Sequence, residues 1–371
     1  MVLVDQHDFP RDKTCGDGLI PDAYRALQRM GVLGEVLAAA QPISHLRCIG
    51  PRGGHIDVPG TMAVLPRRIL DHILFQAAVR AGAHAATPVR FEAPLLEGER
   101  VVGARLKAGG QTVELRAPWV VLATGAVPQA LIAAGLCERH TPDGVAIRGY
   151  VKNDAIRGRI DKLEVIWHQR LSGGYGWIFP APDGLFNIGT GVVGSHEMQG
   201  DGKGTMRGVN LREMFAAFCA IYPKAGELVQ GGTMVGELKG APLRCSLRGA
   251  RWSRPGLLVS GEAAGSTYAF TGEGIGKALE TGLLAAETLL EGGSDAAIEQ
   301  RYASTLRALQ PRFDLYEKAQ HVNNRPWLVD FVIWRGNKSE GIRRRMAGVL
   351  EETSNPGNIL SWRGLTRLVL E

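Results

Sequence analysis

The stretch from Gly256 to Gly276 constrains the fold most, because it joins a strand, a glycine-rich loop and a helix start. The apolar run Leu257–Val259 predicts a buried parallel strand, and apolar residues at helical spacing predict a helix over 274–290. Thr271 is a candidate N-cap for that helix. A glycine-rich loop before a helix N-terminus is typical of a site for phosphate or another electron-rich group, although tight structural turns share the pattern.

This stretch resembles the second flavin-binding signature of the p-hydroxybenzoate hydroxylase superfamily, and most closely the version found in geranylgeranyl reductases. Three further segments resemble that branch. Residues 9–19 resemble the segment after the second Rossmann strand, residues 174–180 resemble the Tyr-x-Trp-x-Phe-Pro substrate motif, and residues 348–365 resemble the C-terminal end. Because the four segments occur together and in order, the chain is identified as a member of the geranylgeranyl reductase family of FAD-dependent oxidoreductases.

The resemblance implies an α/β fold, α+β overall: a Rossmann-like FAD-binding domain, an antiparallel-sheet substrate domain and a C-terminal helical tail. We assign 1–42, 65–140 and 245–295 to the FAD-binding domain, 43–64 and 141–244 to the substrate domain, and 296–371 to the helical region. Strands are expected near 43–64, 89–115, 118–126, 163–168, 175–180 and 185–193, and helices near 21–30, 67–82, 212–222 and 295–318.

The chain begins at what resembles the second strand of the Rossmann unit, Val2–Asp5, without the Gly-x-Gly-x-x-Gly segment that carries the pyrophosphate in such folds. Two explanations stay open at this point. About 30 upstream residues are missing because the start site is misassigned, or the chain is a true truncation that binds flavin poorly. The first is preferred, because the rest of the pattern is intact.

Cofactor contacts are expected along the whole FAD-binding domain. Asp5, an acid at a strand end, is suited to bind a ribose hydroxyl, and Arg11 is suited to bind a phosphate. Arg67 lies at the start of a helix, where the helix dipole does not favour a cation, so a ligand or an acidic neighbour is expected beside it. In the resembled family Asp stands at the position of Glu262, and Asp-Gly stands at Thr124–Gly125, which predicts weaker or shifted flavin contacts. The expected cofactor-binding residues are Asp5, Arg11, Cys15, Gly16, Arg67, Gly125, Gly261, Glu262, Gly265, Gly272, Gly274 and Ile275.

The expected substrate-binding residues are Tyr175, Trp177, Phe179 and Pro180. Residues two apart in a strand share a face, so the three aromatic rings point the same way. Composition alone favours a core, and the resemblance favours a substrate wall. The resemblance further implies that NADPH or another donor reduces the flavin, and that double bonds of a polyprenyl chain are saturated. A flavin-dependent aromatic monooxygenase and a flavin-free prenyl-lipid binder are the alternatives.

Composition excludes several classes of protein. The sequence contains no run of 18 or more apolar residues, so no membrane span is expected, and its first residues are too short a stretch to be expected to act as a secretory signal. The five scattered cysteines contain no Cys-x-x-Cys pair that would suggest a metal site. We expect a cytoplasmic protein without a metal and without a nucleic-acid partner. The net charge of +6 and the mixed apolar and basic stretch 331–345 suit a membrane surface, while a packing helix with a solvated basic face is the other interpretation.

Overall fold

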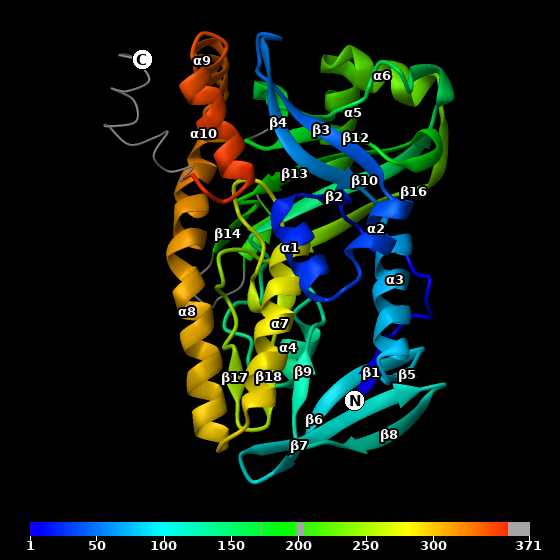
Figure 1. Cartoon of the computed structure of the whole chain (residues 1–371), viewed down its shortest axis with the longest axis vertical. Helices are drawn as coiled ribbons and strands as arrows, with labels where there is room; N and C mark the ends of the chain where they lie inside the picture. Colours follow the sequence, from blue (N-terminus) through cyan, green and yellow to red (C-terminus); the bar gives the residue numbers. More distant parts are fainter. Residues whose placement is uncertain (172, 199–203, 207, 355–371) are drawn as a thin grey trace.

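The computed structural model describes residues 1–171, 173–198, 204–206 and 208–354. Its largest element is a mixed eight-stranded sheet at one end of the molecule, at the top of Figure 1. Neighbouring strands are antiparallel except β3 and β11, which are parallel. In spatial order the strands are β16 (Thr233–Leu243), β10 (Gly144–Lys152), β13 (Leu185–Val193), β12 (Tyr175–Pro180), β11 (Leu163–Ile166), β3 (Gln41–Ile49), β4 (His55–Val64) and β2 (Gly18–Leu19).

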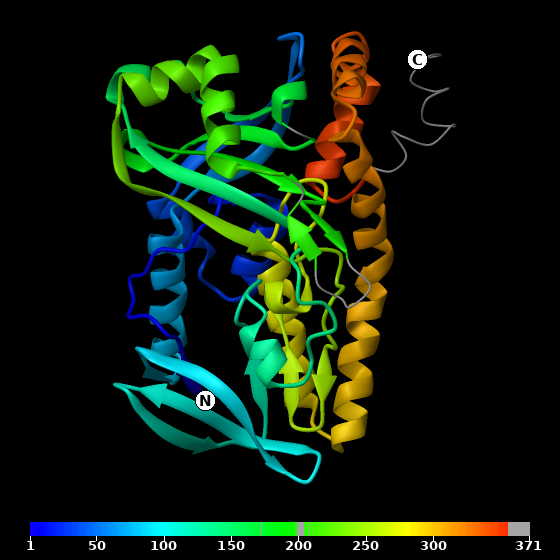
Figure 2. The same ribbon diagram turned by 180° about the vertical axis from the view of Figure 1, so that it is seen from behind.

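The parallel strands of the other half fall into two small sheets. In one, β1 (Val2–Val4) pairs with β5 (His84–Ala86). In the other, β18 (Leu257–Val259) pairs in parallel with β9 (Val120–Leu122) and antiparallel with β17 (Ser253–Arg254). Within the described residues no ladder joins these two sheets. A meander of β6 (Val89–Glu97), β7 (Arg100–Ala108) and β8 (Gln111–Arg116) closes the far end, and Figure 2 shows it from behind.

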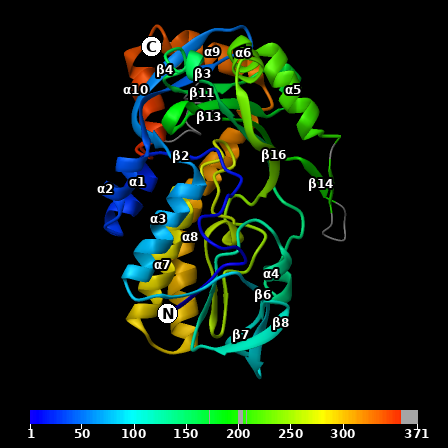
Figure 3. The ribbon, with the colours of Figure 1, turned by 90° about the vertical axis from the view of Figure 1, so that its right-hand side faces the viewer.

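Helices join and cover these sheets (Figures 1 and 3). Two long ones, α7 (Ile275–Glu291) and α8 (Asp295–Ala319), run side by side along the molecule, and α1 (Pro21–Arg29) packs on α7. The eight-stranded sheet lies between α5–α6 on one side and α9–α10 on the other. The bounds of the remaining helices are α2 Leu33–Ala39, α3 Arg67–Arg80, α4 Gln129–Ala133, α5 Leu211–Ile221, α6 Pro223–Gln230, α9 Pro326–Gly336 and α10 Glu340–Leu350; a short ribbon is formed by β14 His196–Met198 and β15 Gly204–Met206.

Alternation along β12 directs its side chains to two different cores. Ile178 joins the apolar core beneath α5 and α6, while Tyr175 and Phe179 pack toward α9 and α10. Gly176 also faces α5, where a Cβ atom would lie 2.5 Å from the ring of Phe218. The sheet therefore has one closely packed face, and an opposite face that carries the aromatic side chains.

The structure confirms the expected fold class, and most expected elements end within a few residues of their predicted bounds. The expected N-cap is wrong: Gly274 takes that position, and no side chain caps α7. Thr271 is held one turn earlier, because Gly272 N–H bonds to the Tyr268 carbonyl and Tyr268 N–H to the Glu273 carbonyl. The division into domains stays a prediction, and positions 355–365 of the expected C-terminal motif lie outside the described residues.

Candidate functional site

A cavity of about 540 Å³ lies where the aromatic face of the sheet meets the start of α7. Its lining includes the loop 13–18, strand β12, the segment 260–275, and helices α9 and α10, together with residues of α3 and of several other strands. Segments more than 200 residues apart in sequence therefore line the same cavity. Its two ends differ in polarity. The segments 13–18 and 260–275 form a polar end, and the inner faces of α9 and α10 form an apolar end.

Arg67 borders the polar end and is held by an acidic neighbour one helical turn away. Its Nε and Nη2 lie 2.6 Å and 2.8 Å from the two carboxylate oxygens of Asp71. Burial opposes its charge, but Asp71 and Cys15 more than compensate and raise the pKa of Arg67. The second carboxylate oxygen of Asp71 also accepts from Arg11 Nη1 at 2.8 Å, and Arg11 Nε lies 3.0 Å from Asp5. Asp5 and Arg11 thus lie behind the lining and hold the residues that form it.

Asp17 joins this loop to the aromatic strand. Its backbone is left-handed, with φ of 65°, and its side chain is buried. Its Oδ2 accepts from Tyr150 Oη at 2.5 Å and from Asn187 Nδ2 at 2.8 Å. Asn187 Oδ1 in turn accepts from Trp177 Nε1 at 2.8 Å. Burial raises the pKa of Asp17 to about 6, against the lowering effect of these hydrogen bonds. No spacing in the sequence pairs Asn187 or Tyr150 with Asp17, so sequence reasoning missed all three.

The rings of β12 form a continuous wall. The ring centroid of Trp177 lies 6.2 Å from that of Tyr175 and 6.4 Å from that of Phe179. Trp167, which sequence reasoning missed, extends the wall, 6.0 Å from Tyr175. All four rings line the cavity, whereas Pro180 ends the strand and does not. A Cβ at Gly189 would lie 2.3 Å from the indole of Trp177, so the neighbouring strand has to be bare there.

The glycine-rich segment borders the wall on its polar side. Tyr175 Oη donates to the Thr271 carbonyl at 2.8 Å, and a Cβ at Gly272 would lie 2.6 Å from the same hydroxyl. Glu262 lies 3.6 Å from Lys13 Nζ and accepts from Thr267 Oγ1 at 3.4 Å. Because no side chain caps α7, the first backbone N–H groups of this 17-residue helix are left for another partner at the cavity.

The expected cofactor residues thus divide into two groups. Those that line the cavity are Cys15, Gly16, Arg67, Gly125, Gly261, Glu262, Gly272, Gly274 and Ile275. Asp5, Arg11 and Gly265 do not line it. Gly265 ends the short turn Gly261–Ala264 with φ of 84° and packs on the backbone of Arg248, so its role is to shape the loop. Their contacts with a cofactor stay a prediction.

The other end of the cavity is aliphatic. It reaches the face of α9 and α10 that packs on β3, β4 and β11. The lining there contains Leu46, Val58, Met62, Leu163, Val165, Val322, Val329, Val332, Ile333, Met346, Val349 and Leu350. A space without charged groups suits a hydrocarbon chain, because each buried CH₂ group contributes about 0.8 kcal/mol. No metal-binding group of three or more His, Cys, Asp or Glu occurs among the described residues.

The chain is similar to curated proteins and to solved structures. No family model matches it. It is 29% identical over 312 residues to a menaquinone reductase of Mycolicibacterium smegmatis, covering 79% of this chain and 71% of that protein. It is 28% identical over 332 residues to digeranylgeranylglycerophospholipid reductase 1 of Methanopyrus kandleri, covering 87% and 82%.

The solved structures share the fold at lower identity. A geranylgeranyl bacteriochlorophyll reductase-like protein of Thermoplasma acidophilum superposes with a TM-score of 0.69 at 19% identity, covering 100% of this chain and 89% of that one. A flavoprotein/dehydrogenase of Cytophaga hutchinsonii gives 0.76 at 15%, covering 99% and 91%. A flavin-dependent brominase gives 0.67 at 16%, covering 99% and 90%. The chain is an oxidoreductase with the FAD-dependent flavoprotein fold.

The polar end of the oxidoreductase's cavity fits a flavin nucleotide on three structural grounds. The N–H groups at the start of α7 lack a side-chain cap, which suits electron-rich oxygen atoms. Gly261 and Gly125, with φ of 64° and 76°, bring bare backbone to the lining. Glu262 offers a carboxylate to hydroxyl groups. Arg67 has one edge of its guanidinium, Nε and Nη2, engaged by Asp71, so it contributes mainly charge to this end.

Proposed function

We propose that this oxidoreductase is a member of the geranylgeranyl reductase family that saturates carbon–carbon double bonds of a polyprenyl chain. The observation that carries the proposal is the single cavity that joins a nucleotide-type loop to an aliphatic space across a wall of aromatic rings. The relatives, which are named for reducing menaquinone and digeranylgeranylglycerophospholipid, support it. The substrate class comprises prenyl lipids, prenylated quinones and prenyl diphosphates.

FAD is the proposed cofactor, held by the start of α7, Gly261 and Glu262 on one side and the loop around Cys15 and Gly16 on the other. When bound and reduced by NADPH or another donor, it supplies the hydride. Arg67 gives this end a fixed positive charge, and the Asp5–Arg11–Asp71 ion pairs keep the helix start in place. The protein's task is to orient both partners and to exclude water.

The aromatic wall is the proposed site of the reacting double bond. An isolated alkene has no carbonyl group to accept the hydride, so the transition state acquires tertiary-cation character. The faces of Tyr175, Trp177 and Phe179 can stabilise positive charge, with Pro180 fixing the strand end. The hydrogen bond from Trp177 to Asn187 holds the indole in one orientation.

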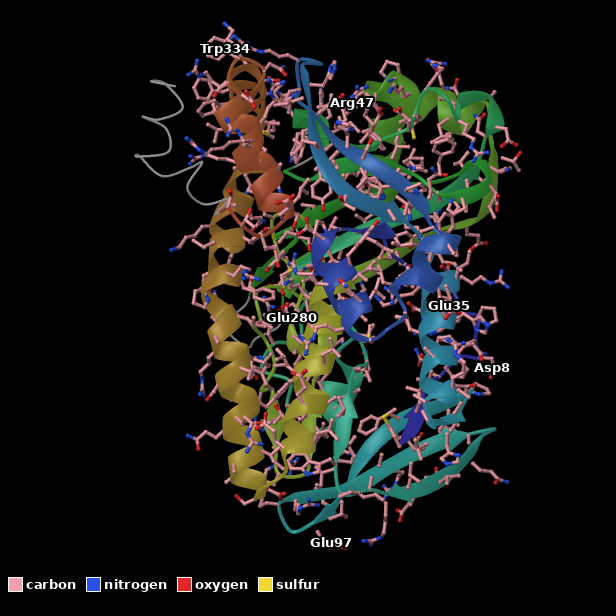
Figure 4. All side chains as sticks on the ribbon, in the orientation of Figure 1. Asp8, Glu35, Arg47, Glu97, Glu280 and Trp334 are labelled. Carbon is pink, nitrogen blue, oxygen red and sulfur yellow. The ribbon has the colours of Figure 1, made fainter. Side chains whose placement is uncertain are left out.

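We further propose that α9 rests on a lipid surface, from which a prenyl substrate reaches the aliphatic end. Its inner face lines the cavity, while Trp327 and Trp334 are 60% and 50% exposed. Trp334 lies at one extremity of the molecule (Figure 4), with Lys338 Nζ 4.4 Å from its ring centre. Aromatic and basic residues together suit an anionic membrane interface. Within the described residues no helix is long and apolar enough to span a membrane.

The test is anaerobic turnover. The protein is loaded with FAD, reduced with dithionite and mixed with geranylgeranyl lipids or menaquinone, and products are identified by the gain of two hydrogens per double bond. We expect Trp177→Ala to lose most turnover per bound flavin. Trp119→Ala is the matched control, since Trp119 packs near α8 outside the cavity and its loss should leave turnover per flavin unchanged.

Two results would favour the other functions. Peroxide or hydroxylated product from an aromatic substrate, without prenyl reduction, would identify a monooxygenase on the same fold. Colourless protein that takes up no FAD yet still binds prenyl chains would identify a lipid binder. Sedimentation with anionic vesicles, compared for the wild type and Trp334→Ser, tests the membrane contact, and equal sedimentation of the two would exclude Trp334 from it.

A further inference from the structure

Glu273 is a cavity residue whose carboxyl group lacks the partners that a charged carboxylate requires. It lies between Gly272 and Gly274 at the start of α7 and borders the cavity beside Tyr175. One side of the residue faces this internal space, but its Oε2 is buried and has no hydrogen-bond partner within the described part of the chain. A buried ionised carboxylate without donors is costly, so the neutral acid is favoured at this position.

The charged groups around Glu273 act in the same direction. Burial, together with the carboxylates of Asp22 on α1 and Glu352 after α10, raises the pKa of Glu273 well above its ordinary value, and the Thr271 side chain and Lys277 oppose this only in part. Lys277 is itself buried and already engaged. Its Nζ lies 2.6 Å from Glu280, 2.7 Å from Glu352 and 3.7 Å from Asp22.

Tyrosines complete the surroundings of the carboxyl group. Tyr175 on β12 and Tyr316 on α8 both have a raised pKa, caused first by burial and then by the negative charge that Glu273 carries when it is ionised. Tyr175 and Tyr316 already donate their O–H groups to the backbone carbonyls of Thr271 and Val349. Neither tyrosine hydroxyl therefore competes for the proton of the Glu273 carboxyl group.

We propose that Glu273 is the proton donor to the double bond that is reduced in the cavity, an assignment that rests on the function proposed above. Saturation of an alkene needs one hydride and one proton. The reduced flavin supplies the hydride with both electrons, and the O–H bond of the Glu273 acid breaks as a C–H bond forms on the other alkene carbon. The carboxylate left behind takes up one proton from solvent before the next turnover.

Other acids at the cavity are less suited to this step. Asp17 accepts two hydrogen bonds through one oxygen and, with a pKa of about 6, is ionised at neutral pH. Glu262 already has partners for both oxygens, because Lys13 Nζ lies 3.6 Å from Oε2 and Thr267 Oγ1 donates to Oε1 at 3.4 Å. The O–H of Tyr175 is held by a backbone carbonyl. Among the carboxyl groups that line the cavity, Glu273 combines an unpartnered oxygen with neighbouring negative charge.

The first measurement needs no turnover and no flavin. Infrared difference spectra of the wild type and Glu273→Gln are recorded at pH 8, where Asp17 and Asp22, each with a pKa raised to about 6 by burial, are ionised. We expect a carbonyl band of a protonated carboxylic acid in the wild type that shifts in D₂O and is absent from Glu273→Gln. Absence of that band from the wild type would overturn the proposal.

The second measurement uses the FAD-loaded protein after anaerobic reduction. Glu273→Gln should bind flavin and accept electrons from dithionite as the wild type does, but its reoxidation by a prenyl substrate should slow by about 100-fold or more. Glu273→Asp should restore part of the rate. Glu287→Gln is the matched control, since Glu287 lies on the same helix but pairs with Arg29 at the surface, and it should behave as the wild type.

The outcomes separate the two proposals. If the wild type reduces no prenyl substrate, the proposed function fails, and the donor role fails with it. If the wild type is active and Glu273→Gln reoxidises equally fast, the function stands and the donor assignment is wrong. If Cys15→Ser, and not Glu273→Gln, slows reoxidation selectively, the donor belongs to the opposite side of the cavity.

Discussion

The two ends of the cavity are built on opposite principles. At the polar end, Asp5, Arg11, Asp71 and Arg67 form a continuous series of ion pairs, and buried Asp17 accepts three hydrogen bonds, from Tyr150, Asn187 and the Arg67 backbone. At the apolar end, the side chains of β3, β4, α9 and α10 enclose a space without charged groups. The polar end depends on individual bonds with fixed geometry, whereas the apolar end depends only on shape and volume. Substitutions at the polar end should therefore lower stability and flavin retention, whereas substitutions at the apolar end should change which substrates are accepted.

The largest effect is expected from Asp17→Ala. The change removes the acceptor of three donors: the half-buried Tyr150 hydroxyl, the buried Asn187 amide and the Arg67 backbone N–H. The loss should be roughly 4 kcal/mol, because each unsatisfied group costs about 1–3 kcal/mol. Urea unfolding measures the loss, and flavin retention should fall with it. Asp8→Ala, at an exposed position of the same N-terminal segment, is the control (Figure 4). Equal stability of the two variants would show that the hydrogen bonds of Asp17, which join the loop 13–18 to the aromatic strand, do not contribute to the free energy of unfolding.

A smaller effect, on the order of 2 kcal/mol, is expected from the pH dependence of Asp22. Burial raises its pKa to about 6 in the folded state from 3.8, although Lys277 opposes the shift. The protonated form is therefore favoured by folding, and this contribution is present below about pH 4 and lost as the pH rises through 6. Unfolding of the wild type and Asp22→Asn at pH 4.5 and 7.5 measures it. The difference should move in favour of the variant at the higher pH, and a constant difference would contradict the shift.

At the apolar end, Val332→Trp should impair long prenyl substrates and leave the flavin untouched. The added ring occupies part of the hydrocarbon space, and such a steric change in an apolar pocket is worth about 1–3 kcal/mol, which corresponds to a roughly 10–200-fold change in turnover of the long substrates. Turnover is compared for prenyl chains of increasing length. Val113→Trp, at an exposed position of β8, is the control. Loss of bound FAD in Val332→Trp would show that the two ends are not independent.

The smallest effect is expected for an ion pair outside the cavity. Arg80 Nη2 lies 2.8 Å from Glu35, but both side chains are exposed, at 57% and 46%. Glu35→Gln should change the free energy of unfolding by less than about 1 kcal/mol, because solvent screens such pairs. A larger loss of unfolding free energy would mean that exposed ion pairs stabilise this protein as strongly as the buried ones at the polar end, which would contradict the comparison.

Local pattern accounts for much of what was expected from the sequence. The spacing of apolar residues in 274–290 gave a helix that the structure places at Ile275–Glu291, and alternation placed Tyr175, Trp177 and Phe179 on one face. The N-cap was wrong, because the backbone of 268–274 folds into a turn that depends on its contact with Tyr175. The residue pattern predicts helices and strand faces well, because both depend on the spacing of residues along a continuous stretch of chain.

The sequence by itself predicted the segments proposed to carry the chemistry: a glycine-rich loop before a helix, an aromatic strand, and a basic N-terminal loop. Only the tertiary structure decided which of their residues meet. Asn187 reaches Asp17, and Asp22 and Glu352 converge near Lys277, through contacts between residues 75 to 255 positions apart. Protonation follows the same rule, because the charge of Glu273 depends on burial and on carboxylates from other helices. Those surroundings exist only once the chain has folded.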